Sequence, residues 1–241
     1  MLAHINTWVF DLDNTLYPKH IALYTQINTR ISDFMISEIG MDREQADIAR
    51  RRMFKAHGST LLGLMHEYKI SPKPFLDFVH DVDLSEIAPS PELDDALRRL
   101  PGQKLIFTNS IGSYSERILQ RIGIRDHFLG IQDLYASQYM PKPAAPAYQE
   151  LIARFGIEPS TTAMIDDMAR NLAPAAELGL TTIWIKGGPF PDDGGNASAI
   201  NHTADELLPW SKLFFIFSGK NAVHNKHLTG KIICSKKCRY G

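Results

Sequence analysis

Short apolar runs alternate along the chain with longer segments whose apolar residues recur at helical spacing. The short runs are rich in β-branched and aromatic residues, which favours buried strands over helices. They cover residues 5–10, 104–107, 130–134, 162–165 and 181–185. Because strands that alternate with helices are joined by right-handed crossovers, the pattern predicts an α/β fold built on a doubly wound, mostly parallel sheet.

The stretch that follows the first strand departs from this rhythm. Its apolar spacing predicts two long helices within residues 20–56 and shorter ones at residues 59–68 and 72–79. Three prolines between residues 89 and 101 then mark the return of the α/β pattern. We therefore expect three parts: a core of residues 1–16 and 89–210, a helical cap of residues 17–88 inserted after the first strand, and a tail of residues 211–241.

Polar residues with catalytic potential follow three of the predicted strands directly. Ligands of open α/β sheets bind just past the carboxyl ends of the strands. An isolated Asp-x-Asp is usually a turn or a helix cap, and an isolated Asp-Asp is usually solvated. Their shared position at strand ends instead predicts a single site. The residues are Asp11 and Asp13, Thr108 and Asn109, and Asp166 and Asp167.

Asp11 and Asp13 lie two positions apart on nearly extended chain, so both side chains can point into one crevice. Unpaired, the two carboxylates would repel each other and take up protons, so a bound cation is their natural partner. Lys142 lies between two prolines in extended chain. Most such lysines are surface residues, but an ammonium group held at this site would stabilise both a phosphate and a carboxylate nucleophile.

The first of these segments, Asp11-Leu12-Asp13-Asn14-Thr15-Leu16-Tyr17-Pro18, resembles the first motif of the haloacid dehalogenase-like (HAD) phosphohydrolase superfamily. It is most similar to the pyrimidine 5′-nucleotidase branch. Thr108-Asn109, Lys142-Pro143 and Asp166-Asp167 resemble the later motifs, in the same order. The resemblance covers residues 5–185 and implies a Rossmann-like core, a cap domain, Mg²⁺ and phosphomonoester hydrolysis through an aspartyl-phosphate.

The resemblance also implies a role for each residue. Asp11 is the nucleophile, and Asp13 is the general acid and base, which a dehalogenase would not need. The implied phosphate-binding residues are Thr108, Asn109 and Lys142, and Lys142 also belongs to the catalytic set. The implied metal ligands are Asp11, Asp13 through its backbone carbonyl, Asp167, and Asp166 nearby or through water.

Charge and cysteine usage restrict the partners. The formal net charge of −1 gives no argument for a nucleic-acid or membrane surface. Residues 218–241 hold six Lys or Arg and no acid, so the first 217 residues carry a net charge of −7. An acidic body fits a small-molecule enzyme that carries a cation better than a nucleic-acid-binding protein. The cysteines, Cys234 and Cys238, lie in this tail, and their irregular spacing from His224 and His227 argues against a zinc site.

The sequence before Asp11 has no signal peptide pattern, so we expect a cytoplasmic protein. Its oligomeric state is not determined by the sequence.

The residues of the predicted cap do not identify a single substrate. Residues 58–64 and 79–83 resemble segments of the nucleotidase branch, which favours nucleoside 5′-monophosphates, pyrimidine ones in particular. The alternatives are another small metabolite, such as a sugar phosphate or phosphoglycolate, and a non-catalytic regulator that binds phosphate ligands. The run Arg50 to Arg52 fits a solvated helix face better than a phosphate or base clamp. The branch commonly has a His where this chain has Tyr114, whose role is open.

Overall fold

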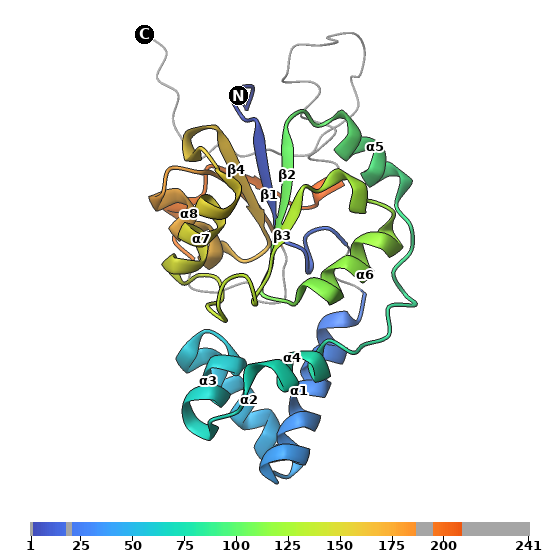
Figure 1. Ribbon diagram of the computed structural model, residues 1–241, viewed down its shortest axis with the longest axis vertical. Helices are drawn as coiled ribbons and strands as arrows, with labels where there is room; N and C mark the ends of the chain where they lie inside the picture. Colours follow the sequence, from blue (N-terminus) through green and yellow to red (C-terminus); the bar gives the residue numbers. More distant parts are fainter. Residues whose placement is uncertain (1, 18–20, 187–194, 209–241) are drawn as a thin grey trace.

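The computed structural model describes residues 2–17, 21–186 and 195–208 (Figure 1). Its centre is a six-stranded sheet with the order β3-β2-β1-β4-β5-β6, in which all neighbouring strands are parallel. The strands are β1 (Thr7–Phe10), β2 (Gln103–Phe107), β3 (Gly130–Gln132), β4 (Thr162–Asp166), β5 (Thr181–Ile185) and β6 (His202–Ala204). The predicted α/β fold with a doubly wound parallel sheet is confirmed. Residues 211–241, with both cysteines, lie outside the described residues.

Helices cover both faces of the sheet, so every residue of its central strands β1 and β4 is buried. Alternate residues of β1 enter different cores: Trp8 and Phe10 pack in one hydrophobic cluster and Val9 in another. The first cluster includes residues of α5 (Pro91–Arg99) and α6 (Gly112–Ile122), and the second includes residues of α7 (Ala145–Phe155) and α8 (Ala169–Glu177). Figure 1 shows these two pairs of helices on opposite sides of the sheet.

Four helices, here called the cap helices, follow β1 and lie apart from the sheet, at the end where its strands stop (Figure 1). They are α1 (Leu23–Ile39), α2 (Arg43–His57), α3 (Thr60–Tyr68) and α4 (Pro72–Val79). A capping box begins α2: the Asp42 side chain accepts from the backbone N–H of Gln45 at 2.8 Å, and the Gln45 side chain accepts from the backbone N–H of Asp42 at 3.1 Å. Among the described residues, no helix has the length and apolar character needed to cross a membrane.

Several element bounds differ from those predicted. The third strand ends at Gln132 rather than at residue 134, because the Asp133 side chain accepts from the backbone N–H groups of Gly112 and Ala136 and forms a turn. The sequence patterns missed α5, whose start is capped by Ser90, and the short strand β6.

Candidate active site

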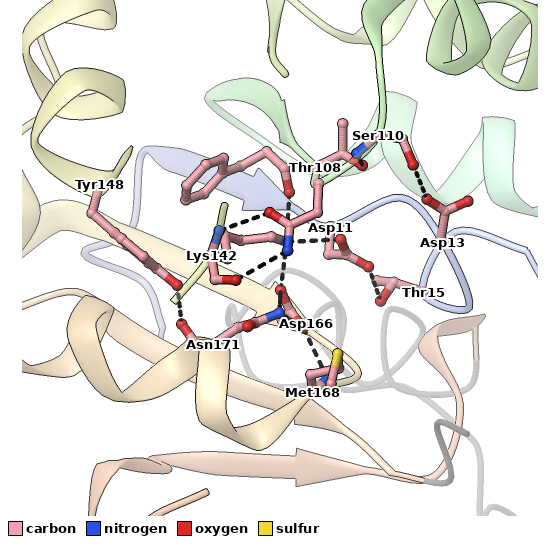
Figure 2. A network of polar contacts seen from close by, with 12 residues as sticks. Asp11, Asp13, Thr15, Thr108, Ser110, Lys142, Tyr148, Asp166, Met168 and Asn171 are labelled. Atoms are coloured by element: carbon pink, nitrogen blue, oxygen red, sulfur yellow. Dashed lines mark hydrogen bonds and ion pairs between the residues drawn. The ribbon is translucent and has the colours of Figure 1, made fainter. Parts of the chain in front are cut away.

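At the centre of the site, Lys142 forms hydrogen bonds with groups at the ends of three strands (Figure 2). Its Nζ donates to Asp11 Oδ1, to Asp166 Oδ2 and to the carbonyl oxygen of Phe107, each at 2.7 Å. Asp11 follows β1 directly, and the other two acceptors lie at the ends of β4 and β2, the strands on either side of β1. Lys142 is only 1% exposed, unlike most lysines, which lie at the surface.

Burial and mutual charge interactions shift the pKa values of Asp11, Asp166 and Lys142. Desolvation raises the pKa of the Asp11 carboxyl and raises that of Asp166 to about 6, while the nearby ammonium of Lys142 opposes both shifts. Burial alone would lower the pKa of Lys142, but the charges of Asp11 and Asp166 raise it above its usual range. Lys142 is therefore a fixed cation that offsets negative charge around Asp11.

Asp167 supplies an oxygen that lacks a hydrogen-bond donor. Ligand oxygens of Asp11, Asp166 and Asp167 all lie within 4.8 Å of one another. Asp167 Oδ2 and Asn171 Oδ1 are buried and have no hydrogen-bond partner in the described part of the chain. Burial, followed by the charges of Asp11 and Asp166, raises the pKa of Asp167 to about 9. An oxygen-only set of buried acceptors fits a hard cation such as Mg²⁺.

Asp166 is less available to such a cation than Asp167. Its Oδ2 accepts from Lys142, and its Oδ1 accepts from the backbone N–H of Met168 at 2.8 Å and from Asn171 Nδ2 at 3.0 Å. The backbone of Asn171 is fixed in turn, because its carbonyl accepts from the Tyr148 hydroxyl at 2.6 Å. The geometry thus distinguishes the two adjacent carboxylates: Asp166 binds Lys142, whereas Asp167 keeps one oxygen without a hydrogen-bond partner among the described residues.

Asp13 is held by three hydroxyl groups. Its Oδ1 accepts from Tyr17 at 2.6 Å and from Tyr114 at 2.9 Å, and its Oδ2 accepts from Ser110 at 2.7 Å. Burial, reinforced by the charge of Asp13, raises the pKa of both phenols well above its usual value, so they remain donors at neutral pH. The question left open for Tyr114 is thereby answered in structural terms: it orients Asp13.

The predicted phosphate-binding pair at the end of β2 has internal partners. The hydroxyl oxygen of Thr108 accepts from the backbone N–H of Ser110 at 3.0 Å. The Asn109 side chain binds the Lys142 backbone twice, accepting from its N–H at 2.7 Å and donating to its carbonyl at 3.1 Å. Asn109 therefore fixes the segment that carries Lys142, and phosphate binding by Thr108 and Asn109 stays a prediction. Sequence reasoning missed Ser110 and Tyr17 as site residues, although Tyr17 lies within the first motif and Ser110 follows Thr108-Asn109 directly.

A pocket of about 370 Å³ connects these groups with the cap helices. Asp11, Asp13, Asp167 and Lys142 line one end of it. The other end includes residues 58–61, which lie in a segment that the sequence linked to specificity, and His80 from the second such segment. Gly63 instead packs tightly against Met53 of α2, so the first segment serves both packing and the pocket. The volume suits a small molecule.

Comparisons with known proteins agree with this geometry. Residues 5–179 match the model of the haloacid dehalogenase-like hydrolase family. Phosphate metabolism protein 8 of Saccharomyces cerevisiae is 26% identical over 187 residues, which cover 71% of this chain but only 58% of the yeast protein. Glyceraldehyde 3-phosphate phosphatase of Methanocaldococcus jannaschii is 24% identical over 201 residues, covering 76% of this chain and 86% of that protein.

Solved structures share the fold. A HAD phosphatase from Thermococcus onnurineus aligns with a TM-score of 0.59 at 18% identity, over 87% of this chain and 98% of its own. A dehalogenase with an intermediate complex aligns with a TM-score of 0.55 at 16% identity, over 90% and 99%. Because a phosphatase and a dehalogenase both align, the fold alone does not identify the reaction. The family model covers more than half of the sequence, and the chain belongs to the haloacid dehalogenase-like hydrolases.

Proposed function

We propose that this hydrolase cleaves phosphomonoesters with Mg²⁺ and forms an aspartyl-phosphate on Asp11. The observation that supports the proposal most directly is that the carboxylates of Asp11 and Asp13 have different hydrogen-bond partners. Asp11 is paired with Lys142, whereas Asp13 is held by hydroxyl groups alone. A nucleophile beside a cation and a second carboxylate for proton transfer are what two-step phosphate transfer requires.

The residues divide the reaction as follows. Asp11 attacks phosphorus, and Asp13 in its protonated form gives its proton to the leaving oxygen. Asp13 then takes a proton from the water that cleaves the aspartyl-phosphate, which returns free phosphate and the Asp11 carboxylate. Lys142 holds Asp11 in place and offsets its charge. When held by Asp11, Asp167 and the Asp13 carbonyl, Mg²⁺ supplies positive charge that offsets the repulsion between Asp11 and the phosphate dianion.

Nucleoside 5′-monophosphates, pyrimidine ones in particular, are the proposed substrates. The support is the resemblance of residues 11–18, 58–64 and 79–83 to the nucleotidase branch, together with a pocket of small-molecule size. A sugar phosphate or phosphoglycolate is the second candidate. The similarity to a glyceraldehyde 3-phosphate phosphatase favours a small phosphorylated metabolite of this kind.

Phosphate release from nucleotides and sugar phosphates, with Mg²⁺ and then with a chelator, tests the proposal. We expect turnover that the chelator abolishes and that Asp11→Asn and Asp13→Asn remove. Asp95→Asn is the matched control, because Asp95 is paired with Arg99 on α5, outside the pocket lining. A folded, metal-binding protein that is inactive on every phosphomonoester would instead support the non-catalytic regulator.

A further inference from the structure

The three consecutive arginines of α2 have different surroundings. Arg52 forms a surface ion pair with Glu67, as expected for a solvated helix face. Arg50 and Arg51 line the pocket. Arg50 Nη1 donates to Asn28 Oδ1 at 2.7 Å, while its Nε is buried and has no hydrogen-bond partner within the described ranges. The expectation of a solvated face is therefore wrong for Arg50.

The Nε side of Arg50 is a hydrogen-bonding edge whose Nε–H has no acceptor in the described part of the protein. A guanidinium group carries its donors in a rigid fork, and Nε–H with one Nη–H matches two adjacent acceptors. The side-chain hydrogen bond of Arg50 uses Nη1, and Nε has no hydrogen-bond partner among the residues that the structure describes. A buried donor without an acceptor costs free energy, so a ligand that supplies acceptors there would bind favourably.

Charge and polarity separate the two ends of the pocket. The lining carboxylates, Asp11, Asp13 and Asp167, all belong to the sheet end. At the cap end, Arg50 and Arg51 are joined by Arg170 of α8, whose guanidinium stacks on Phe54 at 4.7 Å. The remaining wall there is largely apolar, with Ile27, Ile31 and Phe75 among its residues. This end suits a compact or flat group with an acceptor edge better than a polyol.

We propose that Arg50 binds a pair of adjacent hydrogen-bond acceptors on the leaving group of the phosphomonoester. The inference rests on the proposed function, which supplies the scissile phosphate. Among pyrimidine nucleotides and small phosphorylated acids, two groups carry such a pair: the N3 and O2 atoms of cytosine, and the carboxylate of a phosphorylated hydroxy acid. Uracil presents an N–H donor at N3 and so offers one acceptor fewer to the same edge.

The test compares kcat/KM for CMP, UMP, phosphoglycolate and phenyl phosphate in the Mg²⁺-loaded wild type and in Arg50→Lys. Lysine keeps the charge but cannot present the fork. We expect kcat/KM for the acceptor-pair substrate to fall about tenfold to a hundredfold, and that for phenyl phosphate to fall by less than about threefold. Arg52→Lys, which changes only the surface pair with Glu67, is the control and should match the wild type.

The substrates distinguish the two sources of the acceptor pair. A selective loss with CMP assigns the subsite to a base, and a selective loss with phosphoglycolate assigns it to a carboxylate. Equal losses on all four esters, or no loss, would overturn the inference. If the wild type hydrolyses phenyl phosphate and Arg50→Lys has wild-type kcat/KM for all four esters, the proposed function stands and only the role of Arg50 is refuted. Dissociation constants of CMP and phosphoglycolate in an Asp11→Asn background give the same comparison without turnover.

Discussion

At the scale of single residues, Lys142 is the group on which the site depends. It is fully buried and bonded to two carboxylates. Removing one partner of a buried ion pair leaves uncompensated charge, which is far more costly than losing a surface pair. Lys142 therefore contributes both to folding and to catalysis.

Lys142→Met should lower the free energy of unfolding by about 3–5 kcal/mol and kcat by roughly a thousandfold. Urea unfolding and phosphate release measure the two effects. Lys104→Met is the matched control, because Lys104 is also buried but donates to the carbonyls of Leu100 and Gly102 rather than to carboxylates. A Lys142→Met protein as stable and active as the control would refute this role.

Tyr114→Phe removes one of the hydroxyl groups that orient Asp13. We expect kcat to fall roughly tenfold with little change in KM, since a hydrogen bond to a charged group is lost while the pocket keeps its shape. Tyr135→Phe, which removes an exposed hydroxyl bonded to Asp77, should leave both constants unaltered. A change confined to KM would show that Tyr114 contacts substrate instead of orienting Asp13.

Asp167 makes Mg²⁺ binding dependent on pH. Burial and neighbouring carboxylates raise its pKa to about 9 in the metal-free protein, so below that pH a proton competes with the cation. The apparent Kd for Mg²⁺ should fall as pH rises from 6 to 8, by up to about tenfold per pH unit for one displaced proton. Titration calorimetry measures this slope, and Asp167→Asn should abolish it. A Kd independent of pH in the wild type would contradict the assignment.

At the scale of elements, His80 joins the cap helices to the core. It follows α4, and its Nδ1 donates to the carbonyl of Leu76 at 2.8 Å. Its ring lies 4.9 Å from that of Tyr114 in α6, and its carbonyl accepts from Arg117 at 2.7 Å. Burial lowers the pKa of His80 to about 4. The imidazole is therefore neutral in the folded protein wherever the pH exceeds that value.

This shift predicts a loss of stability in mild acid. The unfolded chain binds a proton at His80 below pH ~6.5, whereas the folded chain does so only below about 4, so stability falls as pH drops between these values. Between pH 7 and 5 the contribution of His80 should amount to about 2 kcal/mol, measured by urea unfolding. In His80→Gln, the free energy of unfolding should decrease by about 2 kcal/mol less between pH 7 and 5 than in the wild type. His66→Gln, which changes an exposed residue, should show the wild-type decrease. An identical pH dependence in all three proteins would rule out a buried, neutral His80.

Local patterns predicted most elements but not their exact ends. Apolar periodicity located α1 to α4 and the strands β1, β2, β4 and β5 because each segment is strongly patterned. It missed α5, where Asp94, Asp95, Arg98 and Arg99 make the segment highly polar. It also could not predict that Asn109 binds the Lys142 backbone, a contact between residues 33 positions apart. Sequence spacing contains no information on such a contact.

At the scale of the whole molecule, the topology explains the site. Strand β1 lies between β2 and β4, so the residues that follow these strands meet at one edge of the sheet. The sequence could therefore predict that Asp11, Asp166 and Asp167 lie together. It could not predict the donors to Asp13 or the inward position of Arg50, which depend on how distant helices pack. The cap helices complete the pocket from the other side.

The most direct test of the proposed reaction is to trap phosphate on the protein. Rapid acid quenching during turnover of the preferred ester with Mg²⁺, followed by peptide mass spectrometry, should find one phosphoryl group on the peptide that contains Asp11. The species should be absent from Asp11→Asn. In Asp13→Asn, which lacks both the acid for its formation and the base for its hydrolysis, it should form slowly and then persist. Sustained Mg²⁺-dependent turnover with no phosphorylated Asp11 at any quench time would contradict the proposed mechanism.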